Sequence, residues 1–232
     1  MPSLRTLAAA FIASALALPA AAQTRNRDAD IRKYPAKDWA TNGGDASNTR
    51  YSTLTQITPQ NAKNLKGAWV THLGSGLGAK YSFEATPVVK DGILYIATGN
   101  DDVFALDGKS GALIWEWRSK IEQNINTVCC GWDNRGLAIG EGKIFMGQLD
   151  GNMVALDAKT GKRLWKSEIG KWKEGYTITS APLYYNGVLY TGIAGGDREA
   201  RGKVVAVDAK TGKINWTWWT VPAPGEFGSD TW

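Results

Sequence analysis

The chain has 232 residues and a formal net charge of +5, from 27 Lys and Arg against 22 Asp and Glu. After removal of a short leader, this length is enough for one sizeable core in a soluble domain. The basic residues are scattered among turns of the DAKTGK type, whereas nucleic-acid binding requires a clustered basic face. We therefore expect no nucleic-acid partner.

The N-terminus has the three-part layout of a secretory signal peptide. Arg5 precedes an apolar run from Leu7 to Leu18, and small residues follow up to Ala22. A transmembrane anchor is the alternative, but a span needs about 20 apolar residues, and no later segment is apolar enough either. We expect residues 1–22 to be the signal peptide and residues 23–232 the mature part, in a periplasm where cysteines can stay oxidised.

Beyond an entering segment at 39–69, short apolar runs alternate with turn residues. Runs at 86–98, 136–149 and 181–193 each contain two β-branched or aromatic stretches, separated by DG, EG or NG. These dipeptides are typical of hairpin turns in which both residues take a positive φ. The pattern predicts antiparallel strands rather than helices.

A repeat of about 50 residues organises the same region. Each copy reads as an apolar strand, then Asp-x-Lys-Ser/Thr-Gly, then a strand that contains Trp; the copies are centred on Asp107, Asp157 and Asp208, with Gly111, Gly161 and Gly212 four residues later and Trp115, Trp165 and Trp216 after them. Four strands in about 50 residues describe one blade of a β-propeller. We expect each of the three Trp rings to pack between adjacent blades.

Propellers close with roughly four to eight blades, and three clear copies are present. The chain is therefore expected to be the N-terminal portion of a longer protein.

The only two cysteines, Cys129 and Cys130, are direct neighbours. An ordinary disulfide spans roughly 4.4 to 6.8 Å between Cα atoms, whereas neighbouring Cα atoms are about 3.8 Å apart. A bridge between them would be a poor structural staple. From the residues alone, free thiols or an intermolecular bridge stay open.

Taken together, these motifs resemble those of a known family. The likeness runs from about Asp38 to Trp232 and rests on WATNGGDASNTRYSTLTQIT, FEATP, CCGWDNRG, YTITSAP and GGDREARG, which occur in the family's order. The family is that of the quinoprotein alcohol dehydrogenases, periplasmic eight-bladed all-β propellers that use pyrroloquinoline quinone (PQQ) with a calcium or lanthanide ion. The resemblance implies that about half of the blades are present here.

The resemblance also implies a set of site residues. It implies that Cys129 and Cys130 form a disulfide ring against one face of the quinone and that Arg135 lies near its carbonyl oxygens. The other cofactor-binding residues that it implies are Glu84, Thr179, Ala194, Gly195 and Gly196.

Asp197 falls where the family usually has a metal-binding Glu, and a hard cation prefers carboxylate oxygens. Asp is one methylene shorter than Glu, so it reaches less far. Glu199 is an alternative ligand, and Arg198 is an alternative partner for Asp197.

The implied activity is oxidation of a primary alcohol to an aldehyde, with electrons passed to a cytochrome c or a quinone. The family's catalytic Asp would lie beyond residue 232, so no catalytic residue is expected in this chain, which alone is expected to be incomplete and inactive. No CxxCH haem motif occurs. The alternatives are a non-catalytic periplasmic propeller scaffold, which needs the Trp repeat but not the Cys pair, and an inactive truncated fragment.

Overall fold

The structure, a computed structural model, describes residues 31–231, so the predicted signal peptide lies outside the described residues. The described chain is built almost entirely from short strands. Their bounds are β1 Val88–Lys90, β2 Ile93–Ala97, β3 Val103–Asp107, β4 Leu113–Trp117, β5 Ala138–Gly140, β6 Lys143–Gly147, β7 Asn152–Asp157, β8 Arg163–Glu168, β9 Leu183–Tyr185, β10 Val188–Gly192, β11 Lys203–Asp208 and β12 Ile214–Trp219. Four single-turn 3-10 helices complete the described secondary structure: η1 Ala62–Asn64, η2 Trp172–Glu174, η3 Gly196–Arg198 and η4 Ser229–Thr231.

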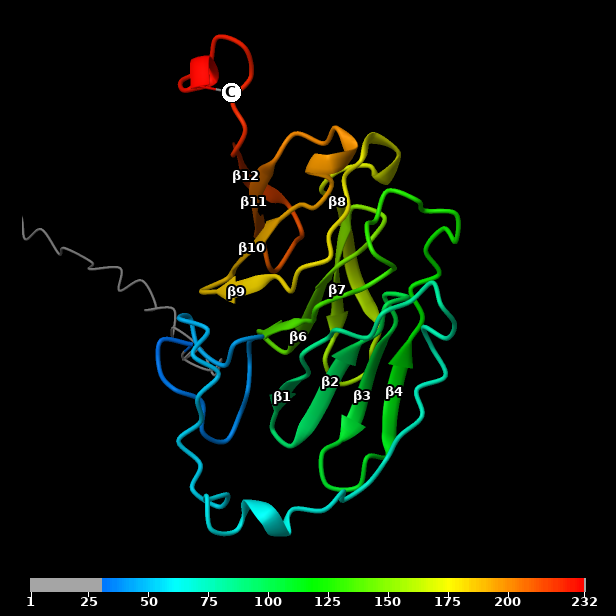
Figure 1. Cartoon of the computed structure of the whole chain (residues 1–232), viewed down its shortest axis with the longest axis vertical. Coiled ribbons are helices and arrows are strands. Elements are labelled where there is room, and N and C mark those ends of the chain that lie inside the picture. The colour runs from blue at the N-terminus through cyan, green and yellow to red at the C-terminus, as the bar shows by residue number, and fades with distance from the viewer. Residues whose placement is uncertain (1–30, 232) are drawn as a thin grey trace, which may run out of the picture.

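The strands form three four-stranded antiparallel sheets, in the orders β1-β2-β3-β4, β5-β6-β7-β8 and β9-β10-β11-β12. Each sheet is a simple meander, so every strand pairs with its neighbour in sequence (Figure 1). The first strands of successive sheets, β1, β5 and β9, lie next to one another. The predicted all-β propeller blades are confirmed, with β1, β5 and β9 as the adjacent first strands.

The predicted hairpin turns have the expected backbone geometry. In all three, both residues of the dipeptide have a positive φ: Asp91 50° and Gly92 81°, Glu141 51° and Gly142 69°, Asn186 46° and Gly187 81°. This conformation matches the right-handed twist of the flanking strands. The turn residues therefore fix the register of the first two strands in each blade.

Trp rings join one blade to the next. Trp115 donates its indole N–H to the carbonyl of Ala158 in the second blade at 3.0 Å, and Trp165 donates to Ala209 in the third at 3.2 Å. Trp69, which the repeat did not single out, does the same toward Gly108 at 3.3 Å. Each ring covers the turn that contains the repeat glycine, and burying such a ring contributes about 2 to 3 kcal/mol.

The third repeat tryptophan departs from this pattern. Trp216 is 47% exposed, and the other large side chains of β12, including Trp218 and Trp219, are exposed as well. Within residues 31–231 no further blade or Asp-x-x-x-Gly turn lies beside Trp216, so its packing between blades stays a prediction.

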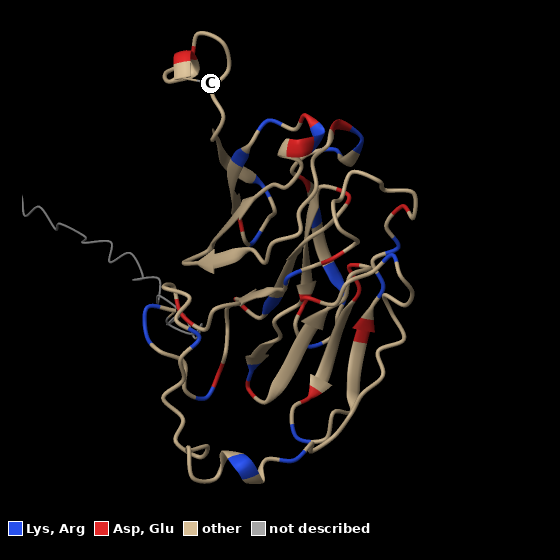
Figure 2. Cartoon of the chain, viewed as in Figure 1, with Lys and Arg blue, Asp and Glu red and all other residues tan. Residues whose placement is uncertain are grey.

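The apolar core lies between the blades. One cluster joins the first and second sheets through residues such as Val88, Leu137 and Val154, and another joins the second and third through Phe145, Ile178 and others. Lys and Arg are interspersed with Asp and Glu over turns, connections and several strands (Figure 2). No helix within residues 31–231 is long and apolar enough to cross a membrane.

Candidate functional site

The predicted site residues lie in the connections that precede the first strand of each blade. Glu84 is four residues before β1, Arg135 three before β5, and Thr179 four before β9. The connections pair directly, since Thr86 bridges Gly136 and the Arg135 N–H donates to the Thr179 carbonyl at 2.9 Å. Residues almost a hundred positions apart in sequence therefore meet at one end of the sheets.

Cys129 and Cys130 form the vicinal disulfide that the resemblance implied, with their Cα atoms 3.9 Å apart. Cys130 has a φ of 63° and Gly131 a φ of 100°, so the chain turns sharply through the left-handed region. Both cysteines are exposed, whereas Trp132 is buried immediately behind them. The bridge thus forms a short rigid surface beside Arg135 in the chain.

Trp132 anchors this segment. Its indole N–H donates to the Ile125 carbonyl at 3.2 Å, and its backbone N–H donates to the Lys80 carbonyl at 2.8 Å. The Lys80 ammonium lies 3.4 Å from the Trp132 ring centroid, and the Tyr81 ring meets it edge-on. Burial lowers the pKa of Lys80. These contacts fix the disulfide against the first blade.

A second, fully buried layer holds the segment from behind. The Asn134 amide donates to the Asp101 carboxylate at 2.8 Å and to the Gly147 carbonyl at 2.9 Å, and the Leu149 N–H donates to Asp101 at 2.7 Å. Burial raises the pKa of Asp101 well above its usual value. Sequence reasoning missed both residues; Asn134 lies inside the CCGWDNRG motif, which was the available signal.

Arg135 lies between two carboxylates from different blades. Its Nη2 is 3.2 Å from Glu84 Oε2, and its Nη1 is 2.7 Å from Asp133 Oδ2. Arg135 and Glu84 are each about half exposed, whereas the Asp133 side chain is only 7% exposed. Burial raises the pKa of Asp133, the nearby Arg135 cation lowers it, and the Glu84 charge raises it. Asp133 was also missed from the sequence.

The glycine-rich stretch reaches the same end of the third blade. Ala194 pairs with Thr177, two residues before Thr179, through the Ala194 N–H at 2.8 Å. A Cβ at Gly195 would lie 1.9 Å from the Gly175 carbonyl oxygen, so only glycine fits there. A Cβ at Gly196 would meet nothing within 4 Å, so that backbone is open to a ligand.

The predicted metal ligand is not part of a cluster. Asp197 is 64% exposed, and the Arg198 Nε lies 3.7 Å from its Oδ2, so the alternative pairing with Arg198 is the one present. Glu199 follows in the left-handed conformation, with a φ of 69°. Within residues 31–231, no group of three or more His, Cys, Asp or Glu side chains is arranged to hold a metal ion. Asp197 as a ligand stays a prediction.

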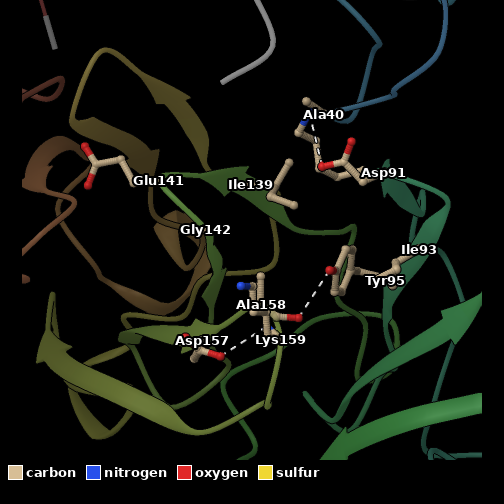
Figure 3. Close-up of a pocket in the computed structure, with 11 residues that line it drawn as sticks. Ala40, Asp91, Ile93, Tyr95, Ile139, Glu141, Gly142, Asp157, Ala158 and Lys159 are labelled. Atoms are coloured by element: carbon tan, nitrogen blue, oxygen red, sulfur yellow. Dashed lines mark hydrogen bonds and ion pairs between the residues drawn. The ribbon is translucent and has the colours of Figure 1, made fainter. Parts of the chain in front are cut away.

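A separate cavity of about 520 Å³ lies at the other end of the sheets, where β1 and β5 finish in their hairpin turns. It is lined by apolar side chains including Ile93, Tyr95 and Ile139, and the Tyr95 hydroxyl donates to the Ala158 carbonyl at 3.2 Å (Figure 3). None of the predicted cofactor-binding residues lines it.

The fold has counterparts among known proteins. Residues 39–232 match the family model described as "PQQ: Glucose/ethanol/alcohol dehydrogenase, beta-propeller domain". The chain belongs to this PQQ-dependent alcohol dehydrogenase family. The match covers all three blades and every predicted site residue, so family membership applies to the whole described propeller.

Individual relatives agree with this family. The chain is 40% identical to the quinohemoprotein alcohol dehydrogenase of Comamonas testosteroni over 220 residues, which is 93% of this chain and 30% of that protein. It is 40% identical to the 1-butanol dehydrogenase (cytochrome c) of Thauera butanivorans over 191 residues, or 82% of this chain and 27% of that protein. The chain therefore spans about a third or less of the length of these relatives.

Solved structures of the family are also similar. A quinohemoprotein alcohol dehydrogenase of Pseudomonas putida superposes with a TM-score of 0.76 at 39% identity, covering 83% of this chain and 28% of that one. A europium-containing methanol dehydrogenase superposes with a TM-score of 0.74 at 36% identity, covering 80% of this chain and 32% of that one. The blade arrangement is thus that of family enzymes.

Proposed function

We propose that the protein carrying this chain oxidises primary alcohols to aldehydes with PQQ and a calcium or lanthanide ion. This chain contributes part of the cofactor pocket, namely the disulfide face and the Glu84, Arg135, Thr179 and Ala194–Gly196 contacts. Its relatives are named as alcohol dehydrogenases, which supports the reaction class. The chain by itself supplies no catalytic base in this proposal.

The observation that carries the proposal is that the predicted cofactor-binding residues lie together at one end of the sheets. The vicinal disulfide, Arg135 and Thr179 come from two blades, yet they lie on connected segments at one end of the sheets. A scaffold held together by its Trp repeat has no use for an exposed adjacent-cysteine ring beside a half-exposed cation. The open backbone at Gly196 leaves room for a ligand beside the same connections.

These residues suit a flat anionic quinone by their chemistry. The Cys129–Cys130 bridge would supply a rigid, non-titrating face, and the Thr179 hydroxyl and the open backbone at Gly196 would receive the carboxylates. When bound, PQQ supplies the electrophilic carbonyl that accepts two electrons from the alcohol. Arg135 would favour the electron-rich reduced form because a nearby cation stabilises negative charge.

The metal, the electron acceptor and the location are further parts of the proposal. Asp197 would contribute one carboxylate to the ion after leaving Arg198, and the remaining ligands would come from outside the described residues. Electrons would pass to a cytochrome c or another quinone; the printed name of the Thauera relative supports the first choice. The periplasm follows from the predicted signal peptide at 1–22.

The test is cofactor binding and activity of the protein as its gene encodes it. The protein, prepared without PQQ, is titrated with PQQ in the presence of Ca²⁺ or a lanthanide and assayed for dye-linked oxidation of ethanol and 1-butanol. We expect activity with one of the two metals, and its loss in the double variant Cys129→Ser with Cys130→Ser. Stable protein that neither binds PQQ nor oxidises either alcohol with any metal would instead support the scaffold.

A further inference from the structure

Asp133 is a buried carboxylate for which the proposed function has so far no use. Its side chain is 7% exposed, and it lies two residues before Arg135 and three after Cys130. A buried carboxylate is costly unless a cation or several hydrogen-bond donors compensate it. Arg135 is the cation paired with Asp133, and the Glu84 carboxyl lies close enough to act on it both by charge and by a side-chain hydrogen bond.

The contact between Asp133 and Arg135 is close but poorly directed. Arg135 Nη1 lies 2.7 Å from Asp133 Oδ2, yet that oxygen has no hydrogen-bond partner of acceptable geometry among residues 31–231. The ion pair therefore lacks the forked alignment that makes arginine–carboxylate pairs strong. The guanidinium is held mainly by charge.

The two partners differ in their freedom to move. Arg135 is 47% exposed and faces the half-exposed Glu84 on its other side, whereas Asp133 is enclosed behind it. The guanidinium can turn toward a ligand on the solvent side, but the Asp133 carboxylate cannot follow. An anionic ligand that attracts Arg135 would leave Asp133 buried without its counter-ion.

We propose that Asp133 is a positioning residue that holds Arg135 while the site is empty and takes up one proton when Arg135 turns toward the anionic cofactor. This inference rests on the proposed function, since it takes PQQ as the ligand. In this step the Asp133 carboxylate takes one proton from solvent and becomes the neutral acid. No electrons move, and no bond other than the new O–H forms.

The charges around Asp133 favour its protonation once Arg135 turns away. Burial already raises the pKa of Asp133, and Glu84 raises it further, while Arg135 is the group that lowers it. Turning the guanidinium away removes the lowering cause and leaves both raising causes in place. Because the ligand-bound state then binds an additional proton, PQQ affinity should increase as the pH falls.

The experiment is isothermal titration of PQQ into the PQQ-free full-length protein at neutral pH, in phosphate and in Tris. These buffers differ in ionisation enthalpy, so the difference in heat gives the number of protons taken up. We expect uptake of about one proton per PQQ in the unaltered protein and close to none for Asp133→Asn. The matched control Asp230→Asn, at an exposed position far along the chain, should keep the unaltered value.

The outcomes separate the two proposals. If PQQ does not bind the unaltered protein, the proposed function fails; if it binds without proton uptake, only the role of Asp133 fails. Uptake that persists in Asp133→Asn but disappears in Glu84→Gln would assign the proton to Glu84 and overturn the inference. Should Asp133→Asn not fold, infrared difference spectra of the unaltered protein decide, because PQQ binding must then produce a new protonated-carboxyl C=O band.

Discussion

The two ends of the sheets differ in role: the hairpin end packs the blades together, and the opposite end carries the candidate site. At the end formed by the hairpins, near-identical Asp-x-Lys-Ser/Thr-Gly turns recur, and the three turns receive the rings of Trp69, Trp115 and Trp165 in turn. At the opposite end the three connections differ at most positions, and they carry the disulfide, Arg135 and Thr179. Repetition therefore marks packing between blades, whereas divergence marks the candidate chemistry.

Trp115 and Trp216 occupy equivalent repeat positions but differ in burial, at 9% and 47% exposed. Trp115→Ala should lower the free energy of unfolding by about 3 to 5 kcal/mol, because it empties the junction between the first two blades. Trp216→Ala should cost less than about 1 kcal/mol in the 232-residue chain. Urea unfolding of both variants measures the difference, and equal losses would contradict the junction role.

Asp101 tests whether the site end also contributes to stability. Asp101→Ala should cost roughly 2 to 4 kcal/mol, because the Leu149 N–H and one bond of the Asn134 amide lose their buried acceptor. Asp91→Ala is the control, since Asp91 shares the positive φ but is exposed. A similar loss in both variants, again by urea unfolding, would attribute the effect to backbone strain.

Comparing Gly161→Ala with Gly142→Ala distinguishes the cost of overpacking from the cost of backbone strain at the hairpin end. Its φ is 70°, and an added Cβ would lie 2.6 Å from the Trp115 ring, whereas Gly142 has a φ of 69° and nothing within 4 Å. Both alanine variants bear the left-handed strain of about 1 to 2 kcal/mol. Gly161→Ala should lose about 1 to 3 kcal/mol more by overpacking, as thermal or urea unfolding would show.

Arg135 should matter for binding and also for stability. Its ion pair with Glu84 is half exposed, and such pairs contribute about 0 to 1 kcal/mol, but its removal also leaves the buried Asp133 carboxylate without its counter-ion. Arg135→Gln should therefore lower the free energy of unfolding by about 1 to 3 kcal/mol and weaken PQQ affinity by at least about tenfold, or 1.4 kcal/mol. Fluorescence titration with PQQ measures the affinity. An unchanged affinity in a folded variant would remove Arg135 from the site.

Substituting a repeat aspartate should have the smallest effect on stability, and that effect should depend on pH in the acid range. The Thr160 hydroxyl and N–H donate to Asp157 at 2.8 and 2.9 Å, and these bonds lower its pKa. A lowered folded-state pKa contributes stability that is present above the unfolded value of about 3.9 and is lost as the pH falls through the folded value. The stability difference between the unaltered chain and Asp157→Ala should shrink below about pH 4. Constant differences across acid unfolding curves would contradict this.

Much of the blade architecture could be predicted because it depends on local rules. The DG, EG and NG dipeptides took the positive φ values expected, and the 50-residue repeat gave three four-stranded sheets. The burial of the Trp216 ring could not be predicted in the same way. A ring's burial depends on which turn lies beside it, and that is not encoded in its own repeat.

For the site, the CCGWDNRG motif and the family resemblance indicated the exposed groups, and the vicinal bridge between Cys129 and Cys130 is present. The buried groups were missed. Nothing about Asp133 in the sequence distinguishes it from a solvated turn aspartate, because its importance comes from the 2.7 Å approach of Arg135 and from enclosure by other segments.

The sequence by itself determined the period, the turns and the kinds of side chain available, since these follow from residue types and short-range backbone preferences. Only the tertiary structure decided which side chains meet. The connections before β1, β5 and β9 are about 50 residues apart in the chain, and they become neighbours because the apolar faces between blades must be buried. That packing places Glu84, Arg135 and Asp133 in one charged group.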